Sequence, residues 1–330
     1  MEREKLIAEV FKIKSQPEFE TLSLAVYRYQ FEHNSIYRQF AQLLKRTPDQ
    51  VHHYTQIPFL PIECFKNYTI ESNSKPVVHV FESSGTTGNN TSKHQVKDLA
   101  LYEKSFNDAF SLFYGDVRDY AIIGLLPGYL ERQTSSLVYM VNDLVAQSTA
   151  PESGFYLNEY DNLKETLQRL KIQNKKVWLI GVSFALLDFS KWNPPVWDQL
   201  IVIETGGMKG RRREMVRSEL HETMRKNWPV NHIHSEYGMT ELFSQAYSFD
   251  GKMFQTPPWM QVLMSQTEDP LSLAKQAETG IINVIDLANI DSCAFIATQD
   301  LGKMDVDNRF EVLGRFDFSD ARGCNLLINV

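Results

Sequence analysis

The sequence predicts an α/β fold with mostly parallel sheets. Between residues 99 and 234, apolar runs with helical spacing alternate with short runs rich in β-branched residues. A loop of Ser, Thr and Gly at 83–88 follows a strand-like run at 77–81. Such alternation is typical of βαβ units, whose ligands gather at the carboxyl ends of the strands.

The elements are expected in the following order. The first 45 or so residues carry Leu, Phe and Tyr at helical spacing, which predicts a helical lead-in over 1–50. The prolines of 57–61 require an extended segment. An α/β part is then expected over 51–242. Its helices are predicted near 99–114, 134–147, 160–173 and 211–226, and its strands at 120–126, 176–182, 200–204 and 230–234.

From residue 243 onward, short strand-like runs are separated by turn signals such as Asp250-Gly251. This pattern predicts a β-rich part over 243–330. Its strands are expected near 261–264, 280–286, 294–298, 310–314 and 325–330. Because no Pro/Gly/Ser-rich linker interrupts the chain, we expect all parts to pack as one compact unit.

Composition narrows the function. The chain has 330 residues, and 34 Lys and Arg stand against 41 Asp and Glu, which disfavours a general nucleic-acid binder. The charged N-terminus and the lack of any run of about 18 apolar residues predict a cytoplasmic protein without a membrane span. The three cysteines form no C-x-x-C pair, so we expect neither a disulfide framework nor a structural zinc site.

The loop at 83–88 is the first candidate ligand site. Its glycines let the backbone approach a ligand, and its hydroxyls add donors, a combination that suits a triphosphate. Asn89 and Asn90 follow it, so it is not a Walker A sequence. An ordinary hydroxyl-rich loop would have the same composition. The loop residues are Ser83, Ser84, Gly85, Thr86, Thr87 and Gly88.

A second candidate is Tyr237-Gly238-Met239-Thr240-Glu241. Gly238 permits a tight turn after a strand, and Thr240 offers a hydroxyl to a phosphate oxygen. Glu241 offers a hard oxygen to Mg²⁺. The alternative is a strand-to-helix turn in which Thr240 caps a helix.

The two motifs, in this order, resemble those of the adenylate-forming superfamily of acyl- and aryl-CoA ligases, luciferases and peptide-synthetase adenylation domains. Thr298-Gln299-Asp300 resembles its ribose-binding segment, and Gly314-Arg315-Phe316-Asp317 its hinge segment. The run 204–210, with Gly206, Gly207 and Met208, resembles the glycine turn beside the adenine, although a solvated basic turn would look alike.

This resemblance implies ATP and Mg²⁺ as cofactors and the attack of a carboxylate on the α-phosphorus of ATP. Such catalysis consists of positioning and electrostatics. Ser84, Thr86 and Thr87 would donate to phosphate oxygens, and Thr240 to the α-phosphate. Glu241 would hold Mg²⁺. The ribose would be bound by Asp300, supported by Arg315.

The chain ends sixteen residues beyond Gly314, whereas typical members continue into a small mobile domain that carries a catalytic lysine. We therefore expect that domain to be absent and CoA ligation to be disfavoured. Lys209 and Lys93 are the candidates for the missing role, because they lie beside the glycine turn and the phosphate loop.

Three segments, 57–66, 128–140 and 315–325, resemble the acyl-protein synthetase (LuxE) family. The resemblance implies that a fatty acid is activated with ATP, held as a thioester on Cys324, and delivered to an acyl-accepting reductase or another protein. Arg322 would favour the Cys324 thiolate, although a buried structural cysteine is the alternative. Cys64 and Cys293 are expected in the core.

An acyl chain needs an apolar trough beside the adenylate. The candidate residues for it are Tyr129, Ser135, Phe184 and His234. Two alternative functions stay open: an acyl- or aryl-CoA ligase or acyltransferase with a small-molecule acceptor, and a binding protein that no longer adenylates.

Overall fold

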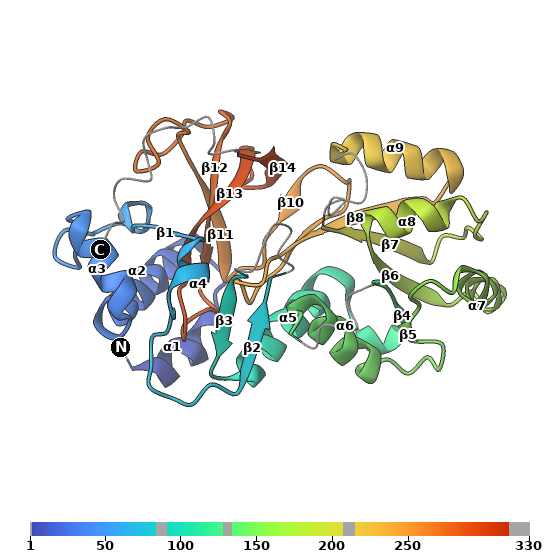
Figure 1. Cartoon of the computed structure of the whole chain (residues 1–330), viewed down its shortest axis with the longest axis horizontal. Coiled ribbons are helices and arrows are strands. Elements are labelled where there is room, and N and C mark those ends of the chain that lie inside the picture. The colour runs from blue at the N-terminus through green and yellow to red at the C-terminus, as the bar shows by residue number, and fades with distance from the viewer. Residues whose placement is uncertain (1, 84–90, 128–133, 207–214, 317–330) are drawn as a thin grey trace.

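The computed structural model describes residues 2–83, 91–127, 134–206 and 215–316 (Figure 1). One twelve-stranded sheet runs through the molecule in the order β11-β12-β13-β14-β10-β9-β8-β7-β6-β4-β5, with β1 added beside β13. A separate ribbon pairs β2 (His79–Glu82) with β3 (Lys93–Val96). The large sheet has a parallel half and a mostly antiparallel half.

In the parallel half every pairing is parallel. Its strands are β4 (Tyr120–Leu125), β5 (Gly154–Phe155), β6 (Lys176–Val182), β7 (Leu200–Thr205) and β8 (His232–Tyr237). Helices cover both faces, and the central strands β4 and β6 are almost wholly apolar (Figure 1). The helices are α5 (Leu99–Tyr114), α6 (Ser136–Gln147), α7 (Tyr160–Ile172), α8 (Ser183–Ser190) and α9 (Arg217–Asn227).

The antiparallel half begins where β9 pairs with β8, and it places Tyr247 beside Glu236. Its strands are β9 (Ala246–Ser248), β10 (Phe254–Gln255), β11 (Met260–Ser265), β12 (Gly280–Asp286), β13 (Phe295–Met304) and β14 (Phe310–Arg315). Here the only parallel pairing within the described ranges is that of β1 (Leu60–Pro61) with β13.

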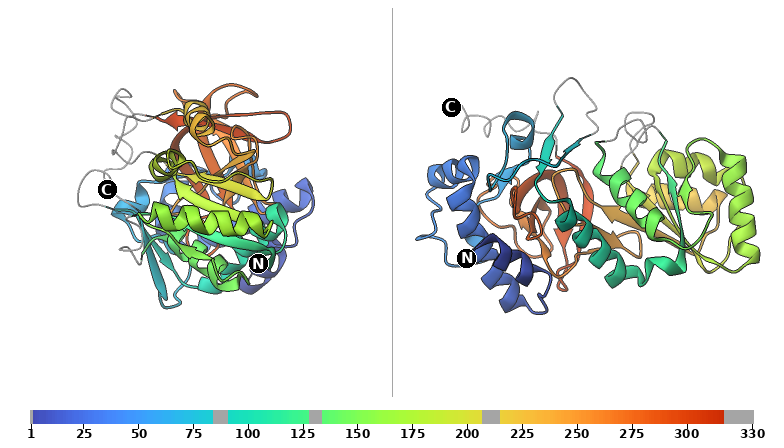
Figure 2. Two further views of the ribbon diagram at one scale, coloured as in Figure 1. Left: turned by 90° about the vertical axis from the view of Figure 1, so that its right-hand side faces the viewer. Right: turned by 90° about the horizontal axis from the view of Figure 1, so that it is seen from below.

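The first helices pack against this antiparallel half (Figures 1 and 2). They are α1 (Arg3–Val10), α2 (Gln16–His33), α3 (Ser35–Leu43) and α4 (Cys64–Asn67), and two 3₁₀ turns occur at Tyr54–Gln56 and Val117–Asp119. The rings of Tyr27 and Tyr37 lie 6.2 and 6.0 Å from that of Phe295 on β13. The helical lead-in therefore shares the core of the β-rich part.

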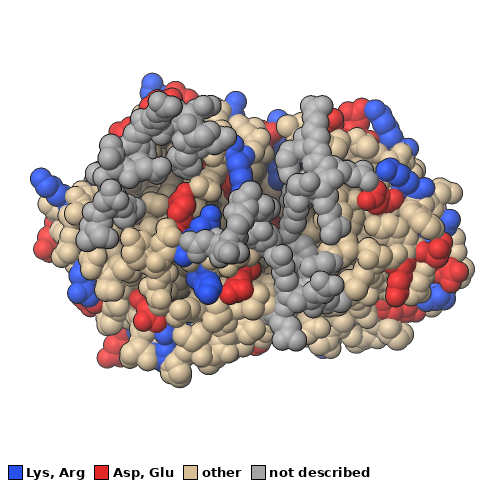
Figure 3. Space-filling model, viewed as in Figure 1, with Lys and Arg blue, Asp and Glu red and all other residues tan. Residues whose placement is uncertain are grey.

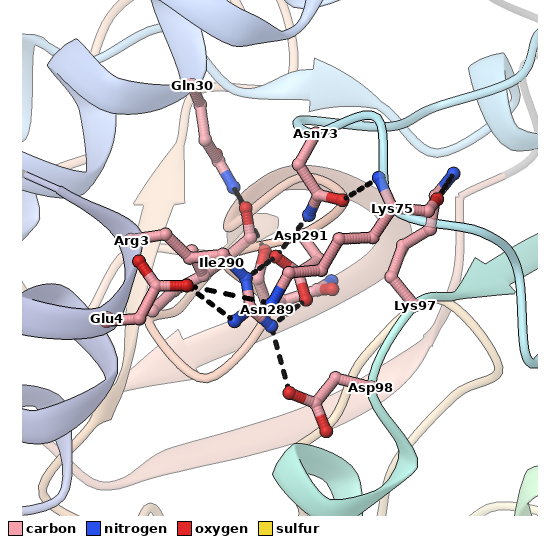
Figure 4. A network of polar contacts seen from close by, with 10 residues as sticks. All are labelled: Arg3, Glu4, Gln30, Asn73, Lys75, Lys97, Asp98, Asn289, Ile290 and Asp291. Carbon is pink, nitrogen blue, oxygen red and sulfur yellow. Dashed lines mark hydrogen bonds and ion pairs between the residues drawn. The ribbon is translucent and has the colours of Figure 1, made fainter.

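A buried ion pair ties α1 to the connection between β12 and β13 (Figure 4). The Arg3 guanidinium donates to both oxygens of Asp291, each at 2.5 Å, and to Asp98 at 3.0 Å. Gln30 of α2 donates to the carbonyl oxygens of Asn289 and Ile290 in the same connection. Side chains thus satisfy the polar groups of a buried loop.

Charged side chains of both signs are interspersed on the described surface that Figure 3 displays. None of the helices within the described ranges combines the length and the apolarity that a membrane crossing needs.

The predicted helix at 99–114 and the strands at 176–182 and 280–286 occur at those bounds. The prediction of a strand at 230–234 is wrong in its bounds. Strand β8 runs from His232 to Tyr237, because pairing with β7 and β9 extends it through polar residues.

The predicted helix at 211–226 also differs, since Met215 and Val216 are not helical and α9 begins at Arg217. Helix α8 and strand β3 were not predicted. The strand expected at 325–330 lies outside the described residues.

Candidate functional site

The carboxyl ends of the parallel strands bring two of the predicted motifs together. Thr205 at the end of β7 pairs with Glu236 near the end of β8. Gly206 follows the first strand, and Gly238 to Glu241 follow the second. The glycine turn and the Tyr-Gly-Met-Thr-Glu turn therefore leave the sheet side by side, where α/β sheets bind ligands.

The base of the Ser/Thr/Gly loop is closed by hydrogen bonds between Ser83 and Ser92. The Ser92 amide donates to the Ser83 hydroxyl at 2.9 Å, and the Ser83 amide donates to the Ser92 carbonyl at 3.0 Å. The Glu82 amide donates to the Thr134 carbonyl. The predicted phosphate ligands Ser84, Gly85, Thr86, Thr87 and Gly88 lie outside the described residues.

Three buried side chains hold the backbone of the turn that begins at Gly238. A ring nitrogen of His94, on β3, lies 2.8 Å from the Thr240 carbonyl oxygen. The Asn289 amide donates to the Glu241 carbonyl at 2.7 Å. Asp286 accepts from the amides of residues 243 and 244 at 2.7 and 2.9 Å. These groups come from β3, from the end of β12 and from the connection that follows β12.

No helix follows the turn in the described chain, which continues into β9. The alternative in which Thr240 caps a helix is therefore wrong. The turn is instead stabilised by tertiary hydrogen bonds, so its conformation depends on distant parts of the sequence.

His94 is a functional candidate that sequence reasoning missed. Its ring is buried and stacks on Phe243, with 4.9 Å between ring centroids. Burial lowers its pKa to about 4, so the ring is neutral near pH 7 and Nδ1 donates to the Thr240 carbonyl oxygen. A polar residue on the inward face of a short strand was the only signal in the sequence.

Glu241 lies against the base of the Ser/Thr/Gly loop. Its side chain is 4% exposed, and burial raises the pKa of the carboxyl group, while the Ser92 hydroxyl and the charges of Lys66 and Arg315 act in the opposite direction. A carboxylate beside a hydroxyl suits Mg²⁺. Within the described residues, no group of three His, Cys, Asp or Glu side chains is placed to hold a metal ion.

The predicted ribose-binding residues also meet. The Tyr237 hydroxyl donates to Asp300 at 2.8 Å, and Arg315 pairs with Asp300 across β13 and β14. Arg315 Nε lies 3.9 Å from Asp300 Oδ1. Burial raises the pKa of Asp300, against the effects of Tyr237 and Arg315.

The glycine turn is anchored beneath Gly206, whose φ of 71° favours glycine. The Ser183 hydroxyl donates to Glu204 at 2.7 Å and also contacts the Gly206 carbonyl. Burial acts to raise the pKa of Glu204, but His221, Arg217 and Ser183 lower it overall. Gly207, Met208 and Lys209 lie outside the described residues.

A second buried carboxyl group, that of Glu236, lies on the neighbouring strand and was also missed. The Thr205 hydroxyl donates to its Oε2. A Cβ at position 238 would lie 2.3 Å from Oε1, so any other residue there would require this carboxyl group to shift. Burial raises the pKa of Glu236 to about 7.

No family model and no curated protein matches the chain. Several solved structures match the chain. An open conformation of 2-hydroxyisobutyryl-CoA ligase with 2-HIB-AMP and CoA matches 92% of this chain and 71% of its own, with a TM-score of 0.66 and 10% identity. ATP-bound MatB from Rhodopseudomonas palustris matches 75% of this chain with a TM-score of 0.54 and 16% identity.

The fold is that of the adenylate-forming enzymes. The α/β prediction is thereby confirmed at the level of fold. An ATP-bound RpMatB-BxBclM chimera also matches, with a TM-score of 0.55 and 16% identity over 75% of this chain and 49% of its own. The chain spans about half the length of these MatB structures.

Within this adenylate-forming fold, the predicted acyl-pocket residues do not form one described cluster. His234 packs against Tyr114 of α5 and Phe249, and burial lowers its pKa to about 4. Phe184 is on α8, across the sheet from α5 (Figure 1). Ser135 caps α6 by accepting from the Val138 amide.

The fourth predicted pocket residue, Tyr129, lies outside the described residues, as does Cys324. Cys64 and Cys293 are buried, which confirms their predicted place in the core. Burial raises the pKa of Cys64 to about 11 and that of Cys293 to about 12, so both thiols are poor nucleophiles.

A groove of about 770 Å³ lies elsewhere, between α9 and β14. Its lining includes Arg217, His221, Glu222, Lys252 and Glu311. None of the predicted nucleotide-binding residues within the described ranges lines it. The convergence of motifs at the strand ends, rather than this groove, marks the candidate site.

Proposed function

We propose that the chain uses ATP and Mg²⁺ to convert a carboxylic acid to an acyl-adenylate, with release of pyrophosphate. The observation that carries the proposal is that the segment 237–241 contacts two predicted parts of the ATP site. Its Tyr237 hydroxyl binds Asp300, the predicted ribose ligand, while its Glu241 lies against Ser92 at the base of the predicted phosphate loop. The ATP and the acyl-AMP named in the matched structures agree with this chemistry.

In this proposal the chain positions ATP rather than reacting with it. Thr240 donates to the α-phosphate, and the His94 contact orients its backbone. Asp300 accepts from the ribose hydroxyls, with Arg315 beside it. The loop hydroxyls of Ser84, Thr86 and Thr87 donate to the leaving pyrophosphate.

Glu241 holds Mg²⁺, which neutralises phosphate charge when bound. Burial raises the pKa of the Glu241 carboxyl group. A bound cation would act in the opposite direction, because it favours the ionised carboxylate. This coupling makes Glu241 the residue on which activation depends most.

We further propose that Cys324 accepts the acyl group. Its thiolate attacks the carbonyl carbon, a C–S bond forms, the C–O bond to AMP breaks, and AMP leaves. The thiol proton is lost to solvent beforehand. The support is the sequence resemblance of 57–66, 128–140 and 315–325 to acyl-protein synthetases, which also suggests a fatty acid and an acyl-accepting protein partner.

A CoA ligase is the second candidate function, because 2-hydroxyisobutyryl-CoA ligase matches 92% of this chain. In that case CoA would take the acyl group and Cys324 would carry none. Lys209, which the sequence places in the glycine-turn segment, would serve the adenylation step in both cases.

Intact-mass spectrometry after incubation with ATP, Mg²⁺ and a series of fatty acids tests the proposal. We expect one acyl mass on the wild type and on Cys64→Ala, a control that removes a buried thiol. Cys324→Ser should keep ATP–pyrophosphate exchange but lose the thioester. Consumption of CoA without an adduct would favour the second candidate, and no exchange with any acid would contradict activation itself.

A further inference from the structure

Helix α4 places a positive charge near Glu241, the candidate metal ligand. Lys66 lies in the last turn of this helix and is exposed. Burial raises the pKa of the Glu241 carboxyl group, and the charges of Lys66 and Arg315 act against this rise. Arg315 lies 3.9 Å from Asp300, its partner at the predicted ribose site. Lys66 has no role in that site or in the proposed reaction as described above.

The lysines that follow Lys66 in the chain differ from it in their partners. Lys75, Lys93 and Lys97 lie 3.6, 3.9 and 2.6 Å from a glutamate oxygen. No ion pair within the described ranges includes Lys66. Within those ranges its ammonium group has no carboxylate partner, so it can bind an anion from solution without first breaking an ion pair.

Contacts on two sides fix the position of α4. Strand β1 pairs with β13 just before the helix begins, and the Glu63 carboxylate accepts from the side chain of Gln299, next to Asp300. The Phe65 ring lies 5.8 Å from that of His94 on β3, and Figure 1 shows α4 between β1 and β3. The helix is therefore held against both the ribose segment and the strand that follows the phosphate loop.

The proposed reaction needs positive charge at this place. When the bond between the α-phosphorus and pyrophosphate breaks, negative charge grows on the leaving group, and Lys or Arg side chains can stabilise it. The described residues assigned to the phosphates and the metal, Thr240 and Glu241, are neutral and acidic. A lysine ammonium is a compact charge with three donors on a flexible stem, so it can stay with the pyrophosphate as the bond breaks.

We propose that Lys66 is a catalytic residue whose ammonium group donates to an oxygen of the pyrophosphate part of ATP. The inference rests on the proposed function and adds a cation to its site. The pyrophosphate part, rather than the adenosine, is assigned because Glu241 contacts Ser92 at the base of the phosphate loop, and α4 packs on the strand that contains Ser92's neighbour Lys93.

Nucleotide binding tests the assignment. Isothermal titration calorimetry with Mg²⁺ and either ATP, AMP or adenosine compares wild type with Lys66→Met. A hydrogen bond between two charged groups contributes enough that its loss should weaken ATP binding about tenfold or more. The affinities for AMP and adenosine should not change, because neither ligand carries the pyrophosphate part.

ATP–pyrophosphate exchange tests the catalytic role. Lys66→Met should lower kcat/KM for ATP about 10- to 100-fold, and Lys66→Arg, which keeps the charge and the donors, should recover most of this loss. The matched control is Lys171→Met, because Lys171 is also exposed in the last turn of a helix, α7, at the other end of the molecule (Figure 1). It should change neither binding nor exchange.

The ratio of ATP affinity to adenosine affinity is measured within one preparation, so a loss of folded protein in a variant does not alter it. Wild-type values of this ratio and of exchange in Lys66→Met would overturn the inference and leave the proposed activation intact. An equal weakening of ATP, AMP and adenosine binding would also overturn it, since Lys66 would then not act on the pyrophosphate part. A wild type that neither binds ATP nor exchanges with any acid would overturn both proposals.

Discussion

The two halves of the sheet handle polar groups differently. In the parallel half, β4 and β6 are apolar along almost their whole length, and polar side chains such as Glu204, Thr205 and Glu236 lie near the carboxyl ends of β7 and β8. In the antiparallel half, buried polar side chains such as Asp286 and Asn289 lie inside the core and are hydrogen-bonded to backbone.

This difference suggests that the parallel half binds the ligand and that the antiparallel half positions the binding residues. Helices cover both faces of the parallel half, so we expect a ligand to bind where its strands end. Buried polar side chains of the antiparallel half form hydrogen bonds with the backbone of the turn at 238–244 and fix its conformation. The reactive edge thus belongs to one half and its positioning to the other. Variants in the two halves should therefore affect different measurements.

The largest expected effect is on the support side. Arg3→Met would leave Asp291 buried without its cation, which typically costs about 3–5 kcal/mol of unfolding free energy. Urea denaturation measures this change. Lys12→Met, which breaks an exposed pair with Glu9, should cost at most about 1 kcal/mol. Equal losses in the two variants would show that the buried pair does not hold α1.

Glu241→Gln should lower the rate of ATP–pyrophosphate exchange and leave stability unchanged. We expect exchange to fall about 10²–10³-fold, or about 3–4 kcal/mol in barrier, because the variant removes a charge that stabilises the reacting phosphate. Its thermal midpoint should not fall, since burial already disfavours the ionised carboxyl group. Glu222→Gln, on the exposed surface of α9, is the control for both measurements. Normal exchange in Glu241→Gln would remove Glu241 from the mechanism.

The ring of His94 contacts the Thr240 carbonyl oxygen and so positions a residue that is proposed to bind the α-phosphate. Variants of His94 should therefore change kcat. His94→Phe keeps a ring against Phe243 but loses the bond to Thr240, and we expect exchange kcat to fall about tenfold, near 1.4 kcal/mol, with KM for ATP little changed. His94→Asn retains a donor near the Nδ1 position and should recover most of the loss. Equal kcat values for the Phe and Asn variants would argue against positioning.

A further expected effect is a pH dependence of stability at Glu236. Its pKa of about 7 in the fold lies above the ordinary 4.5, so its stabilising contribution is complete below pH 4.5 and is lost as pH rises through 7. Glu236→Gln lacks this loss. The thermal midpoint of the variant relative to wild type should therefore rise between about pH 5 and pH 8, by about 2–4 °C per kcal/mol. A constant difference would mean that Glu236 has a cation partner.

The sequence by itself determined the element types wherever periodicity was strong. The apolar run at 176–182 and the helical spacing at 99–114 specify their elements locally, because each pattern buries one continuous apolar surface. The motif order at Gly206, Tyr237 and Asp300 likewise predicts a nucleotide site. These features depend on residue type and spacing alone.

The tertiary structure alone decided which distant side chains support the site. His94 reaches Thr240 across 146 positions, and Asp286 reaches residue 243 across 43. The polar run before Tyr237 became strand because β7 and β9 pair with it on both sides, and this pairing buried Glu236. Such contacts carry no local signal, since hydrogen bonds between distant elements depend on sheet order and register rather than on neighbouring residues.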